Sequence, residues 1–179
     1  MIGNRLIPEY FAGQPIKYRF PYTMPGELVV PANASGVQFP ANAFLHNVDK
    51  PFEIWRMLVH ITAFDSQSPS QMMEVQPQTL RDRIRLSIQD LSKNQAITKN
   101  PQLVSDLLKE NEKTWEWEVP YTIVRQEGML IAVDSQDLPS VCASDPEDAC
   151  VPLSTQVGSV RIEIAFQGFL LYLTDAANR

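Results

Sequence analysis

The chain has few of the residues that catalytic and metal sites require. Its 179 residues include two cysteines and two histidines, and His46 and His60 stand far from both cysteines in the sequence. No GxSxG, P-loop, GxGxxG or HExxH pattern occurs. The cysteines also lack the close spacing that is typical of a zinc site. We therefore expect no enzymatic activity, no catalytic residue, no bound metal and no cofactor.

Positive charge and long apolar runs are scarce as well. Fifteen Lys and Arg residues stand against 21 Asp and Glu, which gives a formal net charge of −6. A nucleic-acid binder needs a basic surface, so we expect no nucleic-acid partner. No run approaches the ~18 apolar residues of a membrane span, and residues 1–5 are not followed by the apolar region of a signal peptide. The sequence therefore predicts no membrane partner.

The two cysteines, Cys142 and Cys150, lie in a segment rich in Ser, Pro and Asp. Their closeness suits a small disulfide loop, although a short loop adds less stability than a long one. Two free thiols are equally compatible with a chain that is made in a cytoplasm and carries no secretion signal. The sequence leaves both alternatives open.

Residues 1–40 differ in composition from the rest and hold six of the 14 prolines. Prolines this frequent exclude a helix and a central strand, yet the segment is too rich in apolar residues for a disordered linker. We expect an extended arm that lies on its own domain or on a neighbouring subunit, and that can be removed without unfolding the rest. The expected anchors of its interface are the aromatic residues Tyr10, Phe11, Tyr18, Phe20 and Tyr22.

Residues 41–179 read as a single domain built mainly from strands. Apolar and polar residues alternate with period two in five stretches: 52–64, 82–90, 115–125, 129–133 and 160–174. Helical spacing occurs only near residues 101–110, after Pro101. The fold class predicted is all-β, an antiparallel jelly-roll-type β-sandwich with the proline-rich N-terminal arm and one short helix.

The last of these stretches, residues 160–174, is expected to be a central strand. Its apolar residues up to Phe166 alternate cleanly, and Gly168 can provide a bulge or bend. After this glycine both faces are apolar, so we expect this end to be covered on both sides. The predicted core combines Ile162, Ile164 and Phe166 with Trp55, Val59, Ile84, Leu86 and Ile131.

Two further surfaces are open to more than one interpretation. Arg81, Arg83 and Arg85 are expected on the outer face of one strand, either in solvent or against an acidic partner, because arginine is a frequent interface donor. Trp115 and Trp117 lie on another strand, where they would form a carbohydrate platform if exposed or part of the core if buried.

Several segments together resemble a known class of proteins. These are the proline-rich arm, Pro-Phe-Glu-Ile-Trp-Arg at 51–56, Trp-Glu-Trp-Glu-Val-Pro-Tyr at 115–121 with its Glu-Gly turn at 127–128, and the closing Val-Arg-Ile-Glu-Ile-Ala-Phe-Gln-Gly at 160–168. They resemble jelly-roll structural proteins of tailed phages, most closely the capsid cement or head-decoration proteins.

The resemblance implies a non-enzymatic virion protein that is made in the host cytoplasm and binds the outside of an icosahedral shell. Its partners would be the capsid protein and copies of itself. Two alternatives remain open. One is another virion subunit on the same fold, such as a capsid, neck or tail protein. The other is a carbohydrate-binding β-sandwich.

Overall fold

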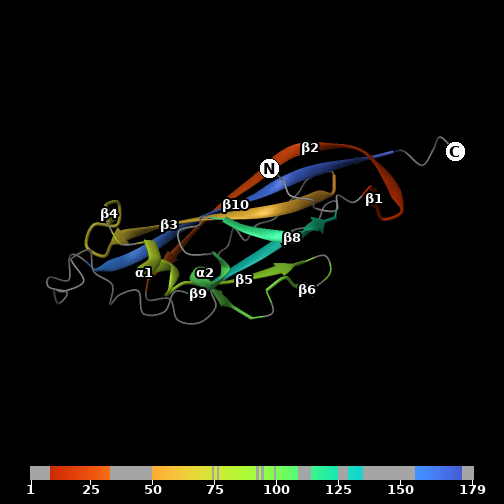
Figure 1. Ribbon diagram of the computed structural model, residues 1–179. Coiled ribbons are helices and arrows are strands. Elements are labelled where there is room, and N and C mark those ends of the chain that lie inside the picture. The colour runs from red at the N-terminus through yellow and green to blue at the C-terminus, as the bar shows by residue number, and fades with distance from the viewer. Residues whose placement is uncertain are drawn as a thin grey trace.

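The computed structural model describes residues 9–32, 50–73, 75, 77–91, 93, 95–98, 100–108, 114–124, 129–134 and 156–174. These residues form mostly antiparallel strands in two sheets, and two short helices lie beside the smaller sheet (Figure 1). The prediction of an all-β, sandwich-like fold is confirmed at this level.

The larger sheet has six strands in the order β1-β2-β10-β3-β4, with β8 also paired to β3. Their bounds are β1 (Tyr10–Phe11), β2 (Gln14–Pro31), β3 (Phe52–Asp65), β4 (Met72–Met73), β8 (Thr114–Ile123) and β10 (Val157–Leu173). The strand β10 is central, because it pairs antiparallel with β2 on one side and with β3 on the other along most of its length. The prediction that the last long stretch is a central strand is confirmed.

The smaller sheet is built around β5 (Arg85–Asp90), which pairs along its whole length with β9 (Met129–Asp134). On its other side β5 pairs with β6 (Gln95–Ala96) and β7 (Gln102–Leu103) at its two ends. The helix α2 (Val104–Leu107) lies where the sequence predicts a helix. The helix α1 (Pro77–Arg81) was not predicted, and it includes Arg81, which was expected on a strand.

The hydrophobic core lies between the two sheets (Figure 1). Seven of the eight predicted core residues belong to it: Val59, Ile84, Leu86, Ile131, Ile162, Ile164 and Phe166. Trp55 was predicted to belong to it and is only half-buried, because the register of β3 shifts between Ile54 and Arg56. This irregularity places Ile54 in the core in its stead.

The proline-rich residues 14–31 do not lie along a surface as a separate arm, because they form β2 and pair with β10 from end to end. Leu28 and Val30 are buried in the core, while Pro21, Pro25 and Pro31 are exposed. The positions of the three prolines differ by even numbers, so they share one edge of the strand, and the amides on the other edge remain available for pairing. The prediction that these prolines exclude a central strand is confirmed, because beyond Pro15 no described strand pairs with the other edge of β2. Of the two alternatives for the segment, its described part lies on its own domain, as a strand of the sheet.

The hairpin that joins β1 to β2 has two residues at its turn, Ala12 and Gly13, both with positive φ (49° and 78°). Such turns match the natural twist of paired strands. Next to this hairpin, β2 and β10 form a two-stranded ribbon that continues past Phe52, the first residue of β3 (Figure 1). We call the part of this ribbon past Phe52, formed by residues 14–19 and 171–173, the extension.

Candidate functional site

The side of the larger sheet that faces away from the smaller sheet is here called the outer face. Its rows are set by strand register: Ala165 on β10 lies between Pro25 on β2 and Leu58 on β3, and Glu163 lies between Glu27 and His60. Odd-numbered residues of β2 from Pro21 to Pro31 are all exposed on this side. The outer face is thus a broad accessible surface with apolar and charged rows.

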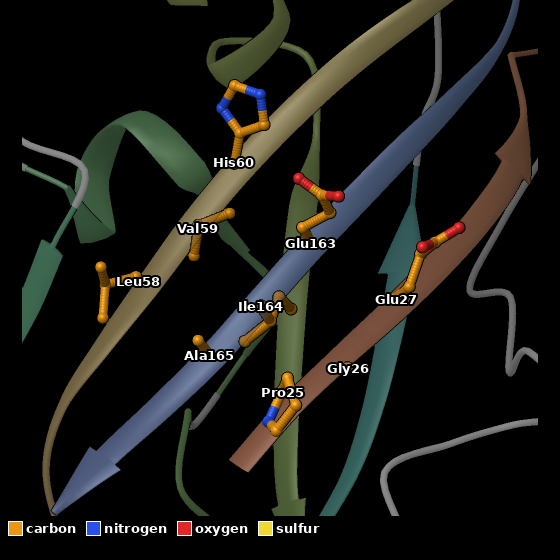
Figure 2. A pocket seen from close by; sticks show the side chains of 9 residues that line it. All are labelled: Pro25, Gly26, Glu27, Leu58, Val59, His60, Glu163, Ile164 and Ala165. Atoms are coloured by element: carbon orange, nitrogen blue, oxygen red, sulfur yellow. The ribbon is translucent and has the colours of Figure 1, made fainter. Parts of the chain in front are cut away.

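The first of two hollows on the outer face has a volume of about 530 Å³. Figure 2 shows Ala165 on β10, with Pro25 on β2 to one side and Leu58 on β3 to the other. The hollow forms here because Ala165 has a methyl group where its neighbours across the sheet have larger side chains. Its floor and walls are therefore apolar.

Charged groups close one end of this hollow. The carboxylates of Glu27 and Glu163 lie on directly opposed residues, an arrangement that destabilises a sheet when it is unrelieved. The Arg161 Nε atom lies 3.1 Å from Glu27 Oε1, and this ion pair offsets part of the repulsion. His60 lies on the far side of Glu163 and is exposed (Figure 2). This end offers hydrogen-bond acceptors and one imidazole to a partner.

The second hollow, of about 520 Å³, follows along the outer face toward the extension. Its lining includes Pro21, Trp55, Arg56, Gln167 and Phe169. The Arg56 guanidinium donates from Nε to Gln167 Oε1 at 2.6 Å, which holds both polar side chains in place. This hollow therefore combines aromatic walls with positioned polar groups.

A buried carboxylate fixes the aromatic wall of the second hollow. Glu53 is 1% exposed and accepts a hydrogen bond from Trp55 Nε1 at 2.7 Å. It also accepts from Arg19, at 3.2 Å from Nε and 3.4 Å from Nη2. A buried charge that has these donors keeps the indole and the guanidinium in one arrangement before any partner arrives.

The five aromatic residues predicted as interface anchors divide into two groups. Tyr10, Tyr18 and Phe20 are 62%, 48% and 54% exposed. Phe11 and Tyr22 are half-buried, and the Tyr22 ring packs edge-to-face on Phe52 with 5.4 Å between centroids. Three of the five side chains are thus available on the surface, and Tyr22 is a neighbour of the core.

The other predicted site residues lie elsewhere. The arginine stripe is not formed, because Arg81 ends α1 and is buried, Arg83 lies in the following turn, and only Arg85 is on β5. Because the five-residue helix α1 occupies residues 77–81, the strand β5 begins only at Arg85. The three arginine side chains therefore do not share one strand face. Cys142 and Cys150 fall outside the described residues.

The two tryptophans of the carbohydrate hypothesis pack toward the core. Trp115 and Trp117 lie with 4.3 Å between their ring centroids, and Trp117 lies 6.4 Å from the ring of Phe166. Both are half-buried and contact the core cluster. They therefore do not form an exposed aromatic platform.

A polar group between the sheets was not predicted from the sequence. Asp90 on β5 is fully buried and accepts a hydrogen bond from the Tyr121 hydroxyl on β8 at 2.5 Å. Lys93 Nζ lies 3.3 Å from the same carboxylate. Burial, and then the hydrogen bond and charge of Asp90, raise the pKa of the Tyr121 hydroxyl. These residues join the two sheets, and no local pattern relates positions this far apart in sequence.

Comparison with protein-family models, with curated proteins and with solved structures finds no match for this chain. Among the helices of the described residues, none is long and apolar enough to cross a membrane.

Proposed function

We propose that the protein is a non-enzymatic structural component of a tailed-phage particle that binds the outside of the capsid shell as a cement protein. Under this proposal the sandwich is of the jelly-roll type, and the protein is made in the host cytoplasm and ends in the virion. The observation that carries the proposal is the outer face, with its two adjoining hollows of about 530 and 520 Å³.

The composition of the outer face supports a protein partner. Apolar residues such as Pro25, Leu58 and Ala165 alternate along the face with charged residues such as Glu27 and Arg56. Interfaces between proteins that fold separately have this mixture of apolar and polar area. The buried Glu53 carboxylate also favours a binding role, because it already holds Trp55 in place. Little side-chain entropy of Trp55 is therefore lost when a partner binds.

The test uses capsids that lack this protein, prepared from the phage whose genome encodes it. The protein is mixed with these particles, the particles are pelleted through a cushion, and the decorated shells are imaged by electron cryomicroscopy. We expect ordered density on the outer surface and saturable binding. Binding to neck or tail particles in place of shells would favour another virion subunit, and absence of the protein from purified virions would contradict the proposal altogether.

A single substitution tests whether the outer face makes this contact. Ala165→Arg places a long charged side chain in the first hollow, and we expect at least a tenfold loss of binding to capsids. The matched control is Val119→Arg on β8, where the native side chain is 74% exposed and lies outside both hollows. Equal binding by the two variants would show that the contact surface lies elsewhere.

A further inference from the structure

The strand β3 carries one extra residue where it forms a wall of the second hollow. The strands β8 and β10 both pair with Ile54 and with Arg56, and the registers of both pass over Trp55. Side chains of a regular strand alternate between the two faces, whereas a β-bulge of this kind lets two successive side chains lie on one face. Trp55 and Arg56 accordingly both line the second hollow.

Two arginines line the second hollow, and their charges are balanced differently. Arg19 Nε lies 3.2 Å from the buried carboxylate of Glu53, which compensates its charge within the protein. Arg56 donates from Nε to the neutral Oε1 atom of Gln167, and neither of its Nη atoms has a partner among the described residues. Glu116 lies opposite Arg56 in the register with β8, but these two described side chains form no ion pair. The charge of Arg56 is therefore not compensated by direct contact.

The hydrogen-bond donors that remain in the second hollow suit a carboxylate. Because Nε of Arg56 is engaged, the two Nη groups at the end of its guanidinium remain to donate. They form a planar fork that matches the two oxygens of a carboxylate. The Nε2 group of Gln167 also has no partner among the described residues. No carboxylate occurs among the described residues that line this hollow, so the matching acceptor has to come from a ligand.

The first hollow carries the opposite charge. The carboxylates of Glu27 and Glu163 lie at one end of it. Glu163 precedes Gln167 by four residues on β10, which corresponds to roughly 13 Å along a strand. An acidic group is therefore repelled from the end of the first hollow and attracted to the second. Opposite charges at this separation fix the direction in which a partner lies across the outer face.

We propose that the second hollow is a carboxylate-binding site, and that the partner of the outer face inserts an aspartate or glutamate side chain against Arg56 and the ring of Trp55. The identity of that partner rests on the proposed function, whereas the preference of the hollow for a carboxylate does not. One uncompensated guanidinium in a chain of net charge −6 does not suit a polyanion such as nucleic acid, which requires a basic surface. A single carboxylate beside apolar atoms matches both the fork and the aromatic wall.

A titration with small probes tests the second hollow without any capsid. The acidic probe is N-acetyl-aspartate amide, and N-acetyl-asparagine amide is its neutral match of nearly the same shape. NMR follows the side-chain amide signal of Gln167 and the indole signal of Trp55, which are assigned with Gln167→Ala and Trp55→Phe. We expect saturable shifts of both signals with millimolar acidic probe, much smaller shifts with the neutral probe, and no difference between the probes in Arg56→Gln. Equal shifts from the two probes in the wild type, or none from the acidic probe, would overturn the inference.

On capsids, substitutions of Arg56 test whether the partner uses this site. Arg56→Gln should weaken binding at least tenfold. Arg56→Lys should weaken it by about threefold, because an ammonium group keeps the charge and lacks the planar fork. The matched control is Arg85→Gln, which alters an exposed arginine on β5 outside both hollows and should bind like the wild type. High salt should weaken binding of the wild type more than binding of Arg56→Gln, because salt screens the interaction between charges.

Circular dichroism and thermal melting establish that each variant is folded, and Arg56→Lys alone carries the comparison if Arg56→Gln fails to fold. Arg56→Gln and Arg85→Gln that bind capsids equally well, while Ala165→Arg loses binding, would overturn the inference and leave the proposed function standing. Capsids that bind no wild-type protein would contradict the proposed function. In that case the probe titration still decides whether the second hollow takes a carboxylate.

Discussion

Gly168 on β10 lies so close to the backbone of Glu53 on β3 that a Cβ atom built on the glycine would stand 1.8 Å from the Glu53 carbonyl oxygen. The register between the two strands shifts between Gln167 and Gly168. The sequence prediction of a bulge or bend at this glycine is therefore confirmed. The close approach aligns Glu53 with Arg19 and Trp55, and so determines the shape of the second hollow.

Gly168→Ala should destabilise the protein by about 3 kcal/mol, because backbone atoms cannot move aside as a flexible side chain can. Urea unfolding monitored by circular dichroism measures the free energy. Gly13→Ala is the control, since nothing lies within 4 Å of the Cβ position there and only its positive φ opposes the alanine. That control should cost about 1 kcal/mol. If both substitutions lower the free energy of unfolding by the same amount, β3 and β10 separate readily at Gly168.

Phe166 is fully buried and lies 6.4 Å from the ring of Trp117. We expect Phe166→Ala to lower the free energy of unfolding by about 3–5 kcal/mol, because the cavity left between two sheets cannot collapse fully. Chemical denaturation gives this value directly. A loss below about 1 kcal/mol would mean that Phe166 does not pack as a core residue.

The strands with clean alternation could be predicted from the sequence because their signal is local. In β10 the buried residues Ile162, Ile164 and Phe166 follow one another at period two, and every residue between them is polar or small. In β3 the sequence is apolar on both faces, so nothing local revealed the shift of register near Trp55. The prediction for Trp55 failed for this reason.

The hollows of the outer face likewise could not be predicted from local sequence patterns. They arise where Ala165 meets Pro25 and Leu58, three residues brought together only by the register of three strands. No local pattern connects these positions, so neither hollow could be predicted. In α1, by contrast, the sequence does carry a local helix signal: Pro77 stands at the first helical position and Leu80 reaches the core.

Because β2 belongs to the larger sheet, the structure predicts that this strand is needed for folding. The composition predicts the opposite, namely that the N-terminal segment can be removed without unfolding the rest. Leu28 is 1% exposed and Val29 is 55% exposed, although they are neighbours in the chain. Leu28→Ala should cost about 2–5 kcal/mol, whereas Val29→Ala should change stability by less than about 0.5 kcal/mol. Removal of residues 1–30 should accordingly unfold the domain. Equal stability of the two point variants, together with a folded truncated chain, would return residues 14–31 to the role of a dispensable arm.

The pair Tyr121–Asp90 predicts how stability depends on alkaline pH. Burial and the neighbouring Asp90 carboxylate raise the pKa of Tyr121 above its ordinary value of 10.0, so the folded protein retains a proton that the unfolded chain releases. The unfolded state then binds fewer protons than the native state, and the free energy of unfolding falls as pH rises above about 10. Below that pH the contribution of the protonated hydroxyl is fully present.

Other tyrosines and lysines also titrate in this range, so the measurement compares the wild type with Tyr121→Phe. At pH 8 the variant should be less stable, because the buried Asp90 loses a donor while Lys93 remains beside it. The stability difference between the two proteins should narrow as pH rises from 9 to 12, since phenylalanine has no proton to lose. Absorbance at 295 nm should show one of the five tyrosines ionising later than the others in the wild type alone. A stability difference that stays constant across this range would mean that the Tyr121 hydroxyl ionises alike in the folded and unfolded chains.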